Sequence, residues 1–292
     1  MKIALYGKNI HPDALSYVQE LIDKLIAANS EILFYEPFYR VLSQQLACPT
    51  DALVFGDAIS LAKKTDLFIS LGGDGTLLDT LTLVKDSGIP IMGINLGRMG
   101  FLSSISKTEL SVAIGQVLAG EFVIDARSLL SLETPQHIFG DLNFALNELT
   151  INKKDTTSMI LVHVWVDDKF LHSYWADGLI IATPTGSTAY SLSCNGPIIT
   201  PESANFVITP IATHNLTVRP VVIPDNSTIR IRVEGRENKY LVSLDSRSAI
   251  LTPNTDLVVK KAEFKVNLLQ LKDQYFFRTI REKLSWGKDI RN

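Results

Sequence analysis

The segment LFISLGGDGTLLDTLTLVKDSGIPIMGIN, residues 67–95, decides the predicted fold. It begins with a mostly apolar run, Leu67–Leu71, of the kind that forms a buried strand. Two glycines follow, then a helical pattern over 76–85 and a second apolar strand over 89–94. A strand, a helix and a strand in this order are typical of a parallel sheet with a crossover helix.

The flanking sequence repeats this alternation. A short apolar strand is predicted over 2–6 and another over Glu31–Tyr35, with an amphipathic helix between them. Ser106 followed by Glu109 fits a capping box, which predicts a helix that ends near Gly120. Residues 1–120 are therefore predicted to form an α/β nucleotide-binding domain with a Rossmann-like parallel sheet.

The pattern changes near residue 121, where short alternating strands replace the helices. Leu161, His163 and Trp165 alternate with valines over 161–166, and Asp167-Asp168-Lys169 predicts a hairpin turn into a strand that begins at Phe170. Four more strands are predicted, over 228–233, 240–244, 257–261 and 264–269. Residues 121–271 are therefore predicted to form a β-rich, β-sandwich-like domain. Residues 272–292 are predicted to form a helix that returns to the first domain.

Composition excludes several classes of protein. Hydrophobic residues make up 46% of the 292 residues, enough for a substantial core, and the net charge of -3 gives no overall attraction to nucleic acid or an anionic membrane. The two cysteines, Cys48 and Cys194, are too far apart in sequence for a CxxC motif, so we expect neither a zinc site nor a disulfide framework. With no apparent signal peptide and no bilayer-length apolar run, a cytoplasmic protein is expected.

The sequence GGDGT at 72–76 is the first candidate for chemistry. Glycines let the backbone approach a ligand closely, and the N-terminus of the following helix offers free N–H groups that suit a phosphate. This predicts phosphate contacts at Gly73 and Thr76. Asp74 would then contact a metal ion, or orient and deprotonate an attacking hydroxyl. The structural alternative is a tight turn in which Asp74 only caps the helix.

Three further segments carry polar groups where strands end. The run TPTGSTAYSLS at 183–193 offers hydroxyls and an aromatic ring to a sugar or a base, with Asp177 nearby, or it is a Ser/Thr-rich surface loop. Arg98 could bind a phosphate or be a solvated surface residue. Asn147 and Glu148 are neighbours on a predicted strand, so both reach one ligand only if that strand ends or bulges there.

Common catalytic motifs are missing from the sequence. It contains no GxxxxGK[ST], no GxGxxG, no GxSxG and no HExxH, which excludes the usual P-loop, dinucleotide-fingerprint, hydrolase-elbow and zinc-protease interpretations. The enzyme class therefore depends on the glycine-rich segments already described.

Five segments in this order resemble the NAD kinases of the ATP-NAD kinase family. They are GGDGT, NLGRMGFL, the pair at 147–148, DGLIIATPTGSTAYSLS at 177–193 and LTVRPVVIP at 216–224. GGDGT also occurs in similar form in diacylglycerol-type lipid kinases and phosphofructokinases, whereas DGLII joined to TPTGSTAYSLS is more discriminating. The resemblance extends over nearly the whole chain, including KLSWGK near its end.

The resemblance implies a reaction and a set of site residues. The family transfers the γ-phosphoryl group of ATP, or sometimes polyphosphate, to the 2′-hydroxyl of the adenosine ribose of NAD, and it needs a divalent metal such as Mg²⁺. Asp74 matches the family's proton acceptor. The NAD contacts that the resemblance implies, besides Asp74, are Gly75, Asn147, Glu148, Asp177, Thr188, Ala189, Tyr190, Ser191, Leu192, Ser193, Ala212 and Arg247.

The resemblance also implies a homodimer or homotetramer, with parts of the site crossing between subunits. One departure is Cys194-Asn195, where relatives often have Ala-Gly; asparagine tolerates a left-handed backbone, so we expect the turn to be kept. Two other functions compete with NAD kinase: a lipid or other small-alcohol kinase that shares the GGDGT loop, and a non-catalytic NAD-binding sensor. A sensor would have no need of a carboxylate beside phosphates.

Overall fold

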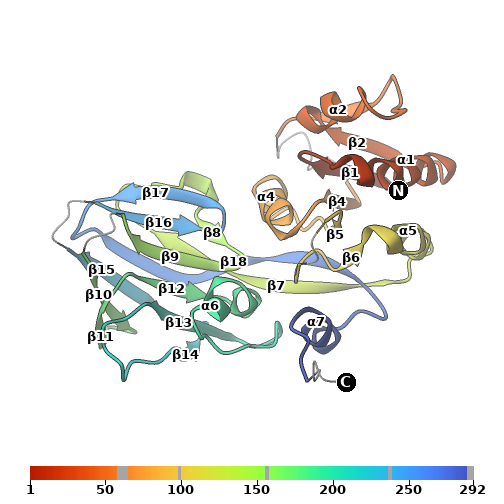
Figure 1. Ribbon diagram of the computed structural model, residues 1–292. Coiled ribbons are helices and arrows are strands. Elements are labelled where there is room, and N and C mark those ends of the chain that lie inside the picture. The colour runs from red at the N-terminus through yellow and green to blue at the C-terminus, as the bar shows by residue number, and fades with distance from the viewer. Residues whose placement is uncertain (58–64, 98–99, 155–157, 236–238, 288–292) are drawn as a thin grey trace. The chain divides into compact units, whose positions relative to one another are not determined.

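The computed structural model describes residues 1–57, 65–97, 100–154, 158–235 and 239–287. The chain divides into two compact units (Figure 1). The first comprises Met1–Ala126 together with Val266–Asn292, and the second comprises Arg127–Lys265. The predicted C-terminal segment, 272–292, thus belongs to the first unit by its contacts, and its last five residues lie outside the described part.

A parallel sheet forms the centre of the first unit. Its strand order is β3-β2-β1-β4-β5, and every neighbouring pair in that order is parallel. The bounds are β1 Lys2–Gly7, β2 Glu31–Tyr35, β3 Leu53–Phe55, β4 Leu67–Leu71 and β5 Ile91–Asn95. A short strand, β6 (Ile105–Ser106), also pairs with β5 in parallel. The predicted parallel sheet is confirmed.

Helices join and cover these strands (Figure 1). Their bounds are η1 Pro12–Ala14, α1 Leu15–Ala27, α2 Glu36–Leu42, α4 Asp74–Val84, η2 Lys107–Glu109, α5 Leu110–Leu118 and α7 Phe276–Lys283. The apolar faces of α1 and α5 share one core with the central strands. Helix α2 was not predicted from the sequence. It is only seven residues long, whereas a helical periodicity is recognised over a window of about 11 residues or more.

The second unit is built of antiparallel strands. One sheet has the order β14-β13-β12-β9-β16-β17. Its bounds are β9 Glu148–Lys153, β12 Gly178–Ala182, β13 Asn205–Ile211, β14 Val221–Pro224, β16 Tyr240–Leu244 and β17 Arg247–Leu251. Two short helical turns, η4 (Thr185–Thr188) and α6 (Tyr190–Ser193), follow β12.

A second group of strands packs against this sheet. It has the order β11-β10-β15-β18, with β7 and β8 beside it. The bounds are β7 Phe122–Glu133, β8 Phe144–Ala145, β10 Ile160–Val166, β11 Lys169–Ala176, β15 Ile229–Glu234 and β18 Asp256–Leu271. A short 3₁₀ turn, η3 (Gly140–Leu142), precedes β8. Buried side chains from both layers form one core, so the predicted sandwich-like domain is confirmed.

Two strand predictions differ from the structure in detail. The predicted hairpin is present, but its turn contains only Asp167 and Asp168, both with positive φ, while Lys169 already pairs with Val166. The predicted strands over 257–261 and 264–269 form one continuous strand, β18. No glycine or proline interrupts that stretch, so the ladder has no local reason to break.

None of the helices in the described part of the chain has the length and hydropathy that a bilayer crossing would require.

Candidate active site

The GGDGT segment lies where β4 gives way to α4. Strand β4 ends at Leu71 and the helix begins at Asp74, two residues earlier than predicted, with Gly73 in the extended N-cap position. Thr76 lies in the first turn and donates its N–H to the Gly73 carbonyl. No described atom lies within 4 Å of where a Cβ on Gly73 or Gly75 would stand, so the protein leaves space above this helix N-terminus.

The Asp74 side chain is held by a turn that follows β5. Its Oδ2 accepts the N–H of Phe101 at 2.7 Å, and its Oδ1 accepts the N–H groups of Leu102 at 3.0 Å and Ser103 at 2.9 Å. Three backbone donors fix the orientation of the carboxylate. Asp74 therefore does more than cap its own helix, because its partners lie 27–29 residues away in sequence.

Gly100 allows this close approach. A Cβ on Gly100 would stand 2.0 Å from Oδ1 of Asp74, a distance that no side chain tolerates. Gly100 thus has a structural role that was not predicted from the sequence. Arg98, predicted to bind phosphate, lies outside the described residues, so its role stays a prediction.

Asn147 and Glu148 stand at a break between two strands. Strand β8 ends at Ala145 and β9 begins at Glu148. The strand is therefore interrupted here, which is the condition under which both side chains can reach one ligand. Asp245 holds the break open, because its carboxylate accepts the N–H groups of Leu146 (2.9 Å), Asn147 (2.9 Å) and Glu148 (3.2 Å). The role of Asp245 was not predicted from the sequence, because an aspartate in a hairpin turn is common.

The same break carries free acceptor atoms. Oδ1 of Asn147 and Oε2 of Glu148 are buried and have no hydrogen-bond partner among the described residues. Burial, together with the neighbouring Asp245 charge, raises the pKa of Glu148 to about 8, although the Tyr190 N–H donates to its carboxylate. Burial also raises the pKa of Asp245, against the three N–H groups and Arg247. Unpaired buried acceptors are expensive unless a ligand supplies donors.

The 183–193 segment is not a surface loop. Thr183, Ser187 and Ser191 are fully buried, and their hydroxyls bond within the protein: Thr183 to the Leu146 carbonyl, Ser187 to the Pro184 carbonyl and Ser191 to the Thr209 hydroxyl. The Thr183 bond joins the segment to the residue before the Asn147–Glu148 break. Gly186 is required there, because a Cβ on it would stand 2.0 Å from the Asn147 carbonyl oxygen.

Other predicted NAD contacts lie around this segment. Tyr190 is 41% exposed, and its pKa is raised by burial and by the nearby Cys194, Asp177 and Glu148. Asp177 itself forms an ion pair with Lys153 at 2.6 Å. Its backbone N–H donates to the carbonyl of Ile211, the residue before Ala212. The charges of Asp177 and Glu148 both act on Tyr190, and the backbone of Asp177 bonds to the residue before Ala212. These four predicted NAD contacts therefore belong to the same unit.

The remaining predicted residues are also described. Thr188 donates its hydroxyl to the Thr185 carbonyl, and Ala189 precedes α6. Ala212 has a positive φ of 46°, and Asn195 has a φ of 65°, so the turn expected at Asn195 is kept. Leu192 and Ser193 lie in α6.

Arg247 contacts the protein rather than open space. Its guanidinium donates to the carbonyl oxygens of Leu142 and Phe144 and lies 5.2 Å from the Phe144 ring centroid. It thereby supports the segment that leads into the Asn147–Glu148 break. A direct NAD contact by Arg247 stays a prediction.

Within the described residues, no group of three or more His, Cys, Asp or Glu side chains is arranged to hold a metal ion. Mg²⁺ is commonly bound through one or two carboxylates plus substrate phosphates. Asp74 is the acidic residue in the first turn of α4, so a metal ion bound there would be held by this carboxylate together with substrate phosphates.

Comparison with known proteins identifies the family. The model for the ATP-NAD kinase N-terminal domain matches residues 3–122, and that for the ATP-NAD kinase C-terminal domain matches residues 146–271. The chain belongs to the ATP-NAD kinase family. It is 45% identical over 293 residues to the NAD kinase of Cytophaga hutchinsonii and 46% identical over 294 residues to that of Flavobacterium psychrophilum, with all of each chain covered.

Solved structures show the same fold. The yeast NADH kinase complexed with NADH has a TM-score of 0.88 at 24% identity, covering 100% of this chain and 89% of that one. An NAD kinase from Archaeoglobus fulgidus in complex with ATP has a TM-score of 0.75 at 24% identity, covering 96% and 99%. Membership of this family decides for an NAD kinase enzyme, against the lipid-kinase and sensor alternatives.

Proposed function

We propose that this NAD kinase transfers the γ-phosphoryl group of ATP to the 2′-hydroxyl of the adenosine ribose of NAD, giving NADP. The family match supports phosphorylation of NAD. That match specifies neither the phosphoryl donor nor the hydroxyl group that receives the phosphate. They are proposed here from the geometry of Asp74 and from the family resemblance.

The hydrogen bonding of Asp74 carries the proposal. An ionised carboxylate has about four acceptor positions. Two backbone N–H groups occupy the acceptor positions of Oδ1, whereas Oδ2 accepts a single N–H among the described residues, that of Phe101. One acceptor position on Oδ2 is therefore left for a hydroxyl, at the N-terminus of a helix whose free N–H groups suit phosphate oxygens.

Positioning dominates the mechanism. Phosphoryl transfer has a loose transition state that needs little covalent assistance, so alignment and charge neutralisation supply most of the acceleration. Asp74 accepts a hydrogen bond from the 2′-hydroxyl, aligns it with the γ-phosphorus and takes its proton late. The backbone amides of Gly73 to Thr76 stabilise the phosphate charge. Such a role is typically worth ~10²–10⁴-fold in rate.

The second unit supplies acceptors for the adenosine of NAD. The free Oδ1 of Asn147 suits a donor such as an adenine amine or a ribose hydroxyl. The Glu148 carboxyl, whose pKa is raised to about 8, can donate a hydrogen bond when protonated and accept one when ionised. The half-exposed ring of Tyr190 offers a face for stacking. The yeast NADH kinase, which has the same fold, is complexed with NADH, and this supports a dinucleotide ligand here.

A divalent cation, Mg²⁺ by the family resemblance, would enter with the donor. It would neutralise charge on the phosphate chain, and Asp74 is the acidic side chain at the phosphate-binding helix. Polyphosphate remains the alternative donor.

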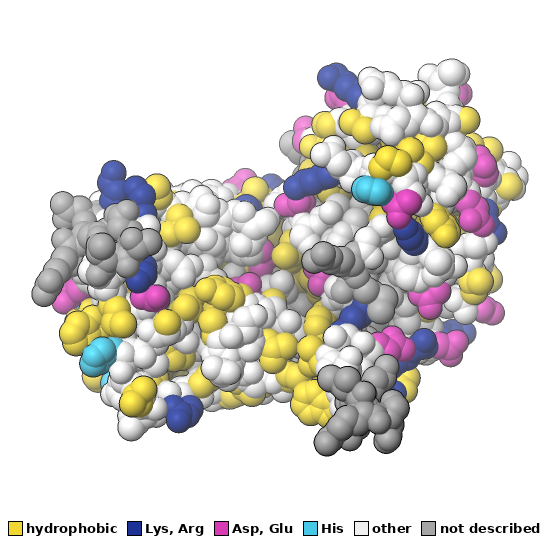
Figure 2. All heavy atoms as spheres, viewed as in Figure 1, with side chains coloured by type: hydrophobic (Ala, Val, Ile, Leu, Met, Phe, Trp, Pro, Cys, Tyr) yellow, Lys and Arg dark blue, Asp and Glu magenta, His cyan; other side chains and the backbone are white. Residues whose placement is uncertain are grey.

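We also propose that the chain is cytoplasmic and acts as a homodimer or homotetramer. Large hydrophobic side chains are exposed on the second unit, and Figure 2 shows hydrophobic surface there; they are Phe170, Trp175, Leu216, Val222 and Ile250. Exposed apolar surface of this kind favours self-association.

One assay tests the function. The purified chain is incubated with NAD, Mg²⁺ and either ATP, polyphosphate or no donor, and the product is separated and identified by ³¹P NMR. The expected product is NADP with its new phosphate on the adenosine 2′-oxygen, formed only with a donor. A folded preparation that never converts NAD, or that places the phosphate elsewhere, would contradict the proposal.

A further inference from the structure

A cavity of about 570 Å³ lies within the first unit, between the start of α5 and helix α7. Ser106, Glu109 and Val112 line it from the α5 side, and Arg278 and Lys283 line it from α7. The mechanism proposed above makes no use of this cavity or of α7.

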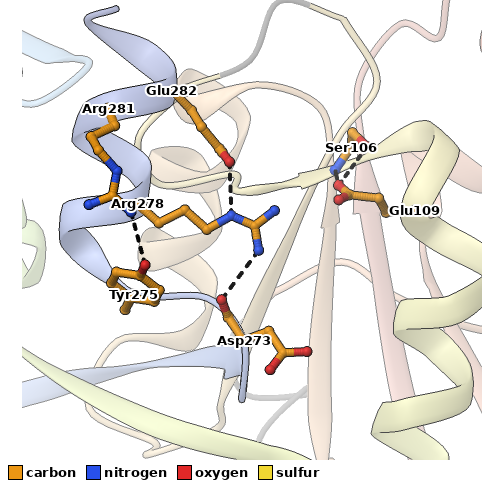
Figure 3. Close-up of polar contacts among 7 residues, drawn as sticks. All are labelled: Ser106, Glu109, Asp273, Tyr275, Arg278, Arg281 and Glu282. Carbon is orange, nitrogen blue, oxygen red and sulfur yellow. Dashed lines mark hydrogen bonds and ion pairs between the residues drawn. The ribbon is translucent and has the colours of Figure 1, made fainter. Parts of the chain in front are cut away.

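Most charges around the cavity are paired. Glu109 accepts the Ser106 N–H at 3.1 Å and the Ser106 hydroxyl at 2.6 Å. Arg278 donates to Glu282 at 2.8 Å and to the Asp273 carbonyl at 3.4 Å. Figure 3 shows Arg278 extending from α7 between Glu282 and Asp273, with Ser106 and Glu109 on the opposite wall. These groups satisfy one another without a ligand.

Lys283 is different. Its Nζ is buried, although its side chain lines the cavity, and it has no hydrogen-bond partner among the described residues. Burial lowers the pKa of its amine, and the charge that most opposes this effect comes from Asp74, ahead of Glu282 and Glu109. The geometry also relates the cavity to Asp74: the N–H of Ser103 donates to Asp74, and the next residue, Ser104, lines the cavity together with Lys283.

A buried ammonium without a partner is costly, and an anion entering the cavity would offset that cost. Lysine is a common ligand of phosphate, which it binds as a point charge with three rotatable donors. The anion that the proposed reaction brings to Asp74 is the phosphate chain of the donor.

We propose, on the basis of the function proposed above, that Lys283 is a phosphate-binding residue, whose ammonium donates to the phosphate chain of the phosphoryl donor beside Asp74. Helix α7 thereby contributes to the transfer site from the C-terminal end of the chain. The cavity provides the approach for the phosphate chain.

Binding of inorganic tripolyphosphate tests this without catalysis. Calorimetry is performed on the parent, on Lys283→Met, and on Arg281→Met, which removes a cation from the same helix outside the cavity lining. Loss of a phosphate-binding cation should raise the Kd for tripolyphosphate at least tenfold in Lys283→Met, with Arg281→Met within twofold of the parent. Equal affinity in the parent and Lys283→Met would overturn the proposal. Lys283→Gln serves as the neutral variant if Lys283→Met does not fold.

Kinetics provide the second readout. Removal of one donor to a developing charge typically costs ~10²–10³-fold in kcat. Lys283→Met should lose about this much, with its KM for NAD within twofold of the parent, and Lys283→Arg should recover at least part of it. Unchanged kcat and ATP KM would overturn the role of Lys283 while leaving the NAD kinase function intact. If the parent forms no NADP, the function proposed above fails, and the tripolyphosphate measurement still decides the role of Lys283.

Discussion

At the residue scale, the site depends on carboxylates that backbone N–H groups hold in place. Asp74 accepts three such bonds from the turn at 101–103, and Asp245 accepts three from residues 146–148. Each bond to a charged acceptor is stronger than a neutral one and fixes the direction of the oxygen. In the proposed mechanism Asp74 presents its remaining acceptor position to a ligand, whereas Asp245 fixes the backbone at the Asn147–Glu148 break.

Glu148 gives a prediction on stability against pH. Its pKa of about 8 in the folded chain exceeds the ordinary value of 4.5, so between these values the native state holds a proton that the unfolded state has lost. Its contribution to stability is full below about pH 4.5 and is lost as pH rises toward 8. Linkage limits this loss to about 1.4 kcal/mol per pH unit. Glu148→Gln should therefore gain stability relative to the parent between pH 5 and 8.

Urea unfolding at pH 5, 6, 7 and 8 measures this difference. The exposed Glu202 supplies a matched control, and Glu202→Gln should follow the parent at every pH. A Glu148→Gln curve parallel to that of the parent would show that Glu148 does not hold its proton in the folded chain.

At the element scale, the sequence predicted strands and helices well where apolar periodicity is strong. Strands β2 and β4 have the predicted bounds, because both are short runs of mostly buried apolar residues, and Gly72 marks the end of β4. The break between β8 and β9 could be stated only as a condition, since it depends on Asp245, about 100 residues further along the chain. For the same reason the partners of Asp74 could not be predicted, although GGDGT indicated Asp74 itself.

The turn before α4 gives a prediction on phosphate binding. A Cβ on Gly73 would contact no neighbouring atom of the described residues, and the φ of -85° at Gly73 suits alanine. Gly73→Ala should keep the thermal midpoint of the parent while its methyl group intrudes on the phosphate. We expect the KM for ATP to rise about tenfold, which corresponds to about 1.4 kcal/mol.

Gly115→Ala is the control for that variant. Its Cβ also meets no protein atom, but it lies on the exposed side of α5, where alanine stabilises a helix by ~1 kcal/mol relative to glycine. Its KM for ATP should equal that of the parent. A Gly73→Ala enzyme with unchanged KM would show that phosphates bind elsewhere.

At the scale of the whole molecule, the sequence predicted an α/β part, a sandwich-like β part and a helix at the C-terminal end, and the structure contains all three. The predicted return of 272–292 to the first domain agrees with the grouping of residues 266–292 with Met1–Ala126. Alternation of element types is a property of long stretches of sequence, so it survives local errors such as the missed α2.

Metal dependence is a prediction for the whole molecule. Since the described residues form no cluster of metal-ligating side chains, the cation should bind with the phosphates and contribute nothing to folding. Chelation by EDTA should abolish NADP formation and leave the thermal midpoint unchanged, and added Mg²⁺ should restore activity. A fall in the midpoint on chelation would instead indicate a metal bound by the protein itself.

The rate of the Asp74→Asn enzyme tests the central claim most directly. The amide keeps the size of the side chain. With its nitrogen in place of Oδ2, the acceptor position that we assign to the 2′-hydroxyl is replaced by a donor. With saturating NAD, ATP and Mg²⁺, and with folding checked by thermal melting, kcat should fall ~10²–10⁴-fold. A kcat within a few-fold of the parent would contradict the account.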